Sequence, residues 1–97
     1  MNVNDLNINF RDICSKFKIR RLEVFGSFAR GDANPASDLD LIAEFEPGDG
    51  LFDRYMDALE EFKVLSHRNV DLITTKKIKN HVFGESINRD RTLVYGG

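Results

Sequence analysis

The sequence predicts an α/β or α+β domain in which a small mixed β-sheet is flanked by helices. Apolar residues recur with helical spacing in two segments, at about residues 5–18 and 51–65. Three shorter apolar runs, at 22–25, 39–45 and 70–74, have the length and composition of buried strands. Helices that alternate with strands in this order favour a sheet covered by helices.

The first predicted helix, at about residues 5–18, has apolar positions that alternate three and four apart, with Asn4 or Asp5 as its cap. These positions are Val3, Leu6, Phe10, Ile13 and Phe17. The strand at 22–25 follows and ends at Gly26. The segment Ser27–Arg30 has room for only a turn or two of helix.

The second half of the chain begins with Asn34-Pro35, a dipeptide typical of loops, and continues with the strand at 39–45. The helix at 51–65 has acidic residues near its positive end. After the strand at 70–74 we expect a helix at about 76–89. The last predicted element is a short strand at Leu93–Tyr95.

Composition narrows the class of protein. The chain has 97 residues and a formal net charge of −2, so we expect one domain over residues 1–97 and little nonspecific nucleic-acid binding. The single cysteine, Cys14, fits a reduced compartment and is expected as buried filler. No apolar stretch approaches the roughly 20 residues of a membrane span, and a cytoplasmic location is therefore expected.

Asp38 and Asp40 lie at the head of the predicted strand 39–45. Because side chains alternate along a strand, both are expected on one face, about 6.6 Å apart along the backbone. Two carboxylates 4 Å apart repel by about 4 kcal/mol at an effective dielectric constant of 20. Either one of them is protonated, both extend into water, or a cation such as Mg²⁺ lies between them.

Asp71 is the one charged residue of the strand 70–74. If this strand neighbours 39–45, Asp71 comes alongside Asp38 and Asp40, and three such carboxylates can hold two Mg²⁺ ions about 3.5–4 Å apart. Such a site suits phosphoryl and nucleotidyl transfer. An aspartate pair at a strand start is, by itself, more often a solvated edge.

The Gly26-Ser27 pair makes a metal and phosphate site more plausible than a solvated strand edge. Gly26 has no side chain to keep a phosphate from the backbone, and Ser27 begins a helix whose free N–H groups favour anions. Arg30, one turn later, can bind phosphate or pair with an aspartate. The alternative is a turn with a serine cap and a surface arginine.

Together the motifs G-S-F-A-R-G at residues 26–31 and S-D-L-D-L at 37–41 resemble the signature of polymerase-beta-like nucleotidyltransferases. The segments 44–53 and 70–74 are similar to those of its minimal nucleotidyltransferase (MNT) subgroup. The resemblance covers roughly residues 20–75, and the closing V-Y-G more loosely. It implies the nucleotidyltransferase core fold.

The resemblance also implies roles for single residues. Asp38 and Asp40 would ligate both metals, and Asp71 would bind one metal and serve as, or position, the general base. Gly26 and Ser27 would hold the triphosphate of ATP, from which AMP is transferred. For Arg30, triphosphate contact and structural support are both open.

MNT proteins typically pair with a HEPN ribonuclease in a toxin–antitoxin module, and the resemblance implies the same here. The chain would be an antitoxin that adenylylates a hydroxyl, expected on tyrosine, of the HEPN toxin in a hetero-oligomer. The last helix, with Gly84, Asn88 and Arg91, departs from the family's more regular apolar pattern. The alternative is an antitoxin that neutralises its toxin by binding alone. An enzyme that modifies a small antibiotic would need a further helical domain, for which 97 residues leave no room.

Overall fold

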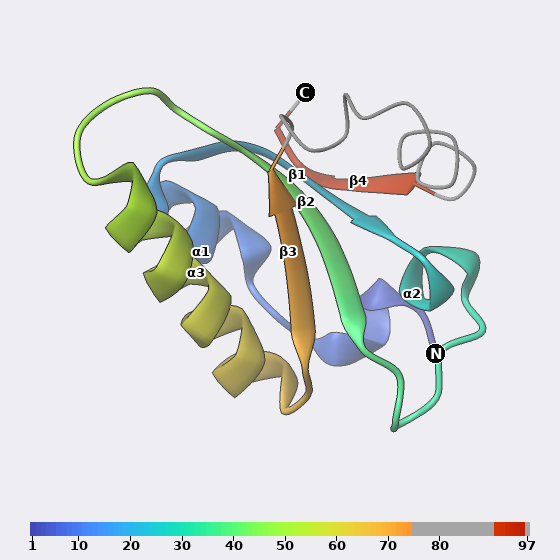
Figure 1. The fold of residues 1–97 in the computed structure, drawn as a ribbon. Coiled ribbons are helices and arrows are strands. Elements are labelled where there is room, and N and C mark those ends of the chain that lie inside the picture. The colour runs from blue at the N-terminus through green and yellow to red at the C-terminus, as the bar shows by residue number, and fades with distance from the viewer. Residues whose placement is uncertain (75–90, 97) are drawn as a thin grey trace.

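Four strands form the sheet in the computed structural model, which describes residues 1–74 and 91–96. Their order across the sheet is β3-β2-β1-β4 (Figure 1). The strands are β1 Ile19–Phe25, β2 Leu39–Phe45, β3 Val70–Thr74 and β4 Arg91–Tyr95. β1 is antiparallel to both of its neighbours, whereas β2 and β3 are parallel. The sheet is therefore mixed, as the sequence predicts.

Helices cover one face of this sheet. α1 (Phe10–Phe17) and α3 (Leu51–Ser66) lie side by side against it, and the short α2 (Ser27–Arg30) follows the end of β1 (Figure 1). α3 crosses from the end of β2 to the start of β3, which is the kind of connection that parallel neighbours require. The predicted α+β class with a helix-covered mixed sheet is confirmed.

The prediction of one continuous helix at about residues 5–18 is wrong, because the structure has two separate helices there. A 3₁₀ helix, η1 (Val3–Leu6), is separated from α1 by Asn7, which has a φ of 55°. Asn2 caps η1 and Asn9 caps α1 by accepting the N–H of Asp12, so neither Asn4 nor Asp5 is a cap. The apolar spacing continues through the break. Asparagine stabilises caps and left-handed turns more than helix interiors, and this preference divides the segment.

The other boundaries agree more closely with the sequence. β1 begins three residues earlier than predicted, because Lys18 ends α1 in the left-handed conformation and Ile19 enters the sheet directly. The helix at 51–65 and the strands at 39–45 and 70–74 are confirmed within a residue. The predicted strand at Leu93–Tyr95 is the end of β4. The predicted helix at 76–89 lies outside the described residues.

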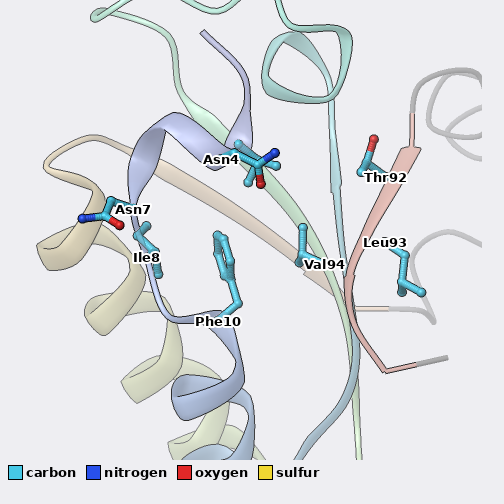
Figure 2. Close-up of a pocket in the computed structure, with 8 residues that line it drawn as sticks. Asn4, Asn7, Ile8, Phe10, Thr92, Leu93 and Val94 are labelled. Atoms are coloured by element: carbon cyan, nitrogen blue, oxygen red, sulfur yellow. The ribbon is translucent and has the colours of Figure 1, made fainter.

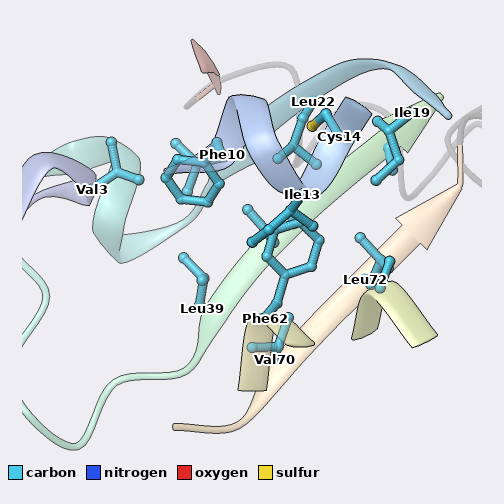
Figure 3. Packing of buried hydrophobic residues seen from close by; sticks show 14 of the residues in the cluster. Val3, Phe10, Ile13, Cys14, Ile19, Leu22, Leu39, Phe62, Val70 and Leu72 are labelled. Carbon is cyan, nitrogen blue, oxygen red and sulfur yellow. The ribbon is translucent and has the colours of Figure 1, made fainter. Parts of the chain in front are cut away.

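The main core lies between the helices and the sheet, where Phe62 of α3 packs among side chains of α1, β2 and β3 (Figure 3). Leu39 and Leu41 of β2 are fully buried on this face. Cys14 is buried here too, as predicted, and burial raises the pKa of its thiol to about 12, which keeps it protonated and unreactive. The opposite face of the sheet carries a smaller cluster of Phe25, Ile42 and Ile73.

An ion pair connects β1 to β4 on the sheet. The carboxylate of Glu23, which is almost fully buried, accepts hydrogen bonds from Nε and Nη2 of Arg91 at 2.7 and 2.6 Å and from Nε of Arg21 at 2.9 Å. These bonds, those from Arg91 above all, lower the pKa of Glu23, although burial opposes the change.

The helices described in residues 1–74 and 91–96 are all too short or too polar to cross a membrane.

Candidate active site

The parallel pairing of β2 and β3 brings Asp40 and Asp71 together. Their Cα atoms are direct partners in the register, one step after the pair Leu39 and Val70. Because Leu39 and Leu41 point into the core, Asp40 lies on the opposite face of β2. Asp71 is exposed between the buried Val70 and Leu72, so it lies on the same open face. The expected approach of these two aspartates is thus found.

Asp38 lies in the turn before β2 and is exposed to solvent. This turn is held by hydrogen bonds within residues 34–37. The N–H of Asn34 donates to Oγ of Ser37 at 2.9 Å, and the N–H of Ser37 donates to the carbonyl of Asn34 at 2.9 Å. The N–H of Leu39 then donates to the carbonyl of Asn69 at 2.9 Å. The serine of S-D-L-D-L therefore shapes the turn that presents Asp38.

Gly26 links the end of β1 to the start of α2, next to Asp40. Its φ of 74° and ψ of −148° belong to a region that only glycine adopts readily. A Cβ atom built on Gly26 would lie 2.6 Å from Oδ2 of Asp40, so a side chain here would collide with the carboxylate. Ser27 is the first residue of α2, where N–H groups have no partner within the helix. The glycine thus permits the close approach of the Gly-Ser turn to the carboxylates.

Arg30 is the last residue of α2. Its Nε donates to Oδ2 of Asp32 at 3.1 Å, in a pair that is exposed to solvent. Arg30 is also close enough to Asp40 to lower that residue's pKa. The predicted pairing of Arg30 with an aspartate is found, although the hydrogen-bonded partner is Asp32.

The carboxylates are electrostatically coupled. Burial, and then the charges of Asp71 and Asp38, raise the pKa of Asp40 from 3.8 to about 6, and Arg30 offsets only part of this change. The negative charge of Asp71 also contributes to a raised pKa of Tyr55, after burial. Asp40 is therefore ionised at neutral pH at a cost in free energy, which a nearby cation would remove.

The three aspartates suit Mg²⁺ by the chemistry of their oxygen donors and by their mutual repulsion. Within residues 1–74 and 91–96, however, no group of three or more His, Cys, Asp or Glu side chains is arranged as a preformed metal site. The expected metal ligands therefore stay a prediction.

Hollows on the described surface lie away from these carboxylates. One, of about 470 Å³, lies between the N-terminal segment and β4, where Phe10 and Val94 face each other and Leu93 points away (Figure 2). Another, of about 530 Å³, is apolar and lies between β2, β3 and the start of α3, at the far ends of β2 and β3 from the aspartates. We assign the site by the carboxylates, because a triphosphate site is polar and open rather than apolar.

Sequence reasoning missed two residues close to the site, the first of which is Arg68. It lies in the turn that precedes β3 and contacts both the turn before Asp38 and the ring of Phe28 in α2. The sequence shows only that a positively charged residue lies three positions before Asp71, and this does not reveal that its side chain contacts carbonyl groups. Tyr55 of α3 is a second such residue, because its hydroxyl donates to the carbonyl of Leu72, next to Asp71.

Comparison with known proteins agrees with the motifs. Residues 8–94 match the family described as "Nucleotidyltransferase domain". A protein of Methanocaldococcus jannaschii with the provisional name protein adenylyltransferase is 36% identical over 81 residues, which are 82% of this chain and 79% of the relative. The protein adenylyltransferase MntA of Thermococcus cleftensis is 29% identical over 77 residues, or 79% of this chain and 77% of the relative.

Solved structures show the same fold. One provisionally described as a minimal nucleotidyltransferase superposes with a TM-score of 0.75 at 27% identity and covers 97% of both chains. A toxin–antitoxin complex with AMP-PNP has a TM-score of 0.68 at 15% identity, covering 93% of this chain and 75% of the other. A complex of tri-AMPylated Shewanella oneidensis HEPN toxin with MNT antitoxin has a TM-score of 0.66 at 14% identity, covering 100% and 74%. The family match over residues 8–94 is decisive, and the chain belongs to the nucleotidyltransferase domain family.

Proposed function

We propose that this chain is a magnesium-dependent antitoxin that transfers AMP from ATP to a hydroxyl, that of a tyrosine, on a partner HEPN ribonuclease toxin. The observation that carries the proposal is the pairing of Asp40 with Asp71 on the open face, beside the Gly26-Ser27 turn. The names of the M. jannaschii and T. cleftensis relatives support a protein acceptor. The complex of an AMPylated HEPN toxin with an MNT antitoxin supports the partner.

In this proposal the oxygen of the acceptor hydroxyl attacks the α-phosphorus of ATP. The new bond joins that oxygen to AMP, the bond from the α-phosphorus to the β-phosphate oxygen breaks, and pyrophosphate leaves. Asp71 accepts the hydroxyl proton or positions the group that does. Gly26 and Ser27 hold the triphosphate through the start of α2, and AMP-PNP in a complex of similar fold supports an ATP donor.

Asp38, Asp40 and Asp71 would hold Mg²⁺. When bound, the ion neutralises the charge of the triphosphate and makes the attacking hydroxyl more acidic. The raised pKa of Asp40 supports this role, because a cation relieves the repulsion that Asp71 and Asp38 impose on it. Arg30, near Asp40, supplies a positive charge on the triphosphate side of the site.

The test uses ATP labelled at the α-phosphate and, as acceptor, a HEPN-family protein sought among the products of the genes that neighbour the one for this chain. We expect label on the HEPN protein only with Mg²⁺ present, and mass spectrometry should show added AMP on a tyrosine. Asp40→Asn should abolish labelling, whereas Asp57→Asn, an exposed aspartate on α3, should not. Labelling that survives Asp40→Asn would show that the site is assigned wrongly.

Neutralisation by binding alone is the second candidate. The N-terminal half of α3 presents Phe52, 74% exposed, and Met56, 44% exposed, to solvent next to the apolar groove of about 530 Å³. Such a surface suits contact with another protein. If binding suffices, the double variant Asp38→Asn, Asp40→Asn will protect cells from the toxin at normal dose. Loss of protection with the complex intact favours catalysis.

A further inference from the structure

Arg68 joins three segments that each carry a part of the candidate site. It lies in the turn between α3 and β3, and its side chain is partly buried. Its Nη1 donates to the carbonyl oxygens of Ser37 at 3.0 Å and Asn34 at 3.3 Å. Its Nε donates to the carbonyl of Ser66 at 3.1 Å, and its guanidinium lies 4.8 Å from the ring centre of Phe28.

Two of these contacts lie next to residues of the site, and Arg68 itself is near a third in the sequence. The Ser37 carbonyl belongs to the peptide that leads into Asp38. Phe28, only 1% exposed, directly follows Ser27 in α2. Arg68 itself is three residues before Asp71. The side chain of Arg68 therefore connects the turn between α3 and β3 to two other segments, the turn that precedes Asp38 and the ring of Phe28 in α2.

We propose that Arg68 is a positioning residue for nucleotidyl transfer, one that sets Asp38 against Ser27 and Asp71. This inference rests on the proposed function. The role is geometric, because Arg68 acts through hydrogen bonds to carbonyl groups and through its contact with the ring of Phe28. Asp38 lies in an exposed turn, and an exposed turn without such a tie samples many conformations. Groups behind metal ligands commonly set metal affinity in this way.

The planar fork of the guanidinium suits this role better than an ammonium group. Nη1 and Nε point to carbonyls of two different segments while the plane stays over the ring of Phe28. Lysine at this position would keep the charge but lose the fixed directions of the donors. We therefore expect Arg68→Lys to restore the function of Arg68→Ala only in part.

Arg54 offers a matched control within the same chain. It also donates to two carbonyls, those of Phe17 at 3.3 Å and Glu46 at 2.9 Å, and lies 6.0 Å from the ring centre of Phe45. These contacts lie beyond the far end of β2 from Asp38. Arg54→Ala thus removes the same kinds of contact without touching the site.

The experiment compares Arg68→Ala, Arg68→Lys, Arg54→Ala and Asp40→Asn in the full chain. Thermal denaturation gives Tm, and electron paramagnetic resonance measures Mn²⁺ binding in the presence of AMP-PNP. AMP transfer to the HEPN protein is measured at varied Mg²⁺. We expect similar decreases in Tm for the two alanine variants. Of these two alanine variants, only Arg68→Ala should weaken Mn²⁺ binding, by roughly tenfold or more, and raise the Mg²⁺ needed for half-maximal transfer.

The outcomes separate the two hypotheses. If Asp40→Asn abolishes transfer but Arg68→Ala binds Mn²⁺ and transfers AMP as Arg54→Ala does, Arg68 is merely structural and the inference fails. If the wild type transfers no AMP to the HEPN protein, the proposed function is wrong instead, and if Asp40→Asn retains transfer, the site is assigned wrongly. Should Arg68→Ala fail to fold, Arg68→Lys and Arg54→Lys are compared by the same measurements. Equal Mn²⁺ affinity in that pair overturns the inference.

Discussion

Replacing Asp40 by asparagine should stabilise the metal-free protein while abolishing AMP transfer. Asparagine has nearly the same shape as aspartate, so it fits in the same place beside Gly26. It removes a charge that burial, Asp71 and Asp38 all disfavour. A residue kept for function at a cost in stability is expected to behave in this way.

The pKa shift sets the size of this gain. One pKa unit corresponds to about 1.4 kcal/mol, so a shift from 3.8 to about 6 gives an upper limit of roughly 3 kcal/mol at neutral pH. Solvent screens part of this cost because Asp40 is only partly buried, and we expect roughly 1–2 kcal/mol. For a domain of this size the gain corresponds to a rise in Tm of roughly 5–15 °C.

The gain should depend on pH in a defined direction. Below about pH 4 the carboxyl group is protonated in both the folded and the unfolded chain, so the penalty is absent. Between about pH 4 and 6 the folded state binds more protons, and the stability of the wild type falls relative to Asp40→Asn as pH rises. Above about pH 6 the full difference persists.

Urea denaturation between pH 4 and 8, with EDTA present, measures this difference directly. Asp57→Asn, exposed on α3, serves as the control and should follow the wild type. Adding Mg²⁺ should stabilise the wild type but not Asp40→Asn, because only a protein that binds the ion gains from it. A variant that is less stable than the wild type at pH 7.5, or a gain independent of pH, would refute the electrostatic argument.

Two further substitutions test features next to the site. Gly26→Ala, which combines an unfavourable backbone conformation with a 2.6 Å contact to Asp40, should cost roughly 2–3 kcal/mol in urea denaturation and abolish AMP transfer. Gly31→Ala also has positive φ but meets nothing within 4 Å, so it should cost only about 1 kcal/mol; equal costs would contradict the steric argument. Glu23→Gln breaks the buried pair with Arg91 and should cost about 3 kcal/mol at pH 7. The lowered pKa of Glu23 places its stabilisation above pH 4.5, so the difference should vanish as denaturation is measured at lower pH; a difference constant with pH would exclude the ion pair as its source.

The sequence predicts those parts of the site that depend on alternation along a strand. Asp40 and Asp71 could be placed on one face because each interrupts an apolar run, and the parallel register confirms that they are partners. The break at Asn7 was missed because the apolar spacing continues through it. Arg68 was missed for another reason, since it acts through carbonyl groups of distant turns, which leave no periodicity in the sequence.

The chain order of the carboxylates has a consequence for how the active site comes into being. Asp38 and Asp40 lie two residues apart at the start of β2, which pairs with the nearby β1, whereas Asp71 reaches them only after α3 has crossed over and β3 has paired in parallel with β2. Contacts of high sequence separation are slow to form, and this one also brings like charges together. A nascent or partly folded chain in which β3 has not yet paired with β2 therefore has no third carboxylate in place, and the capacity for chemistry arises only with this long-range contact.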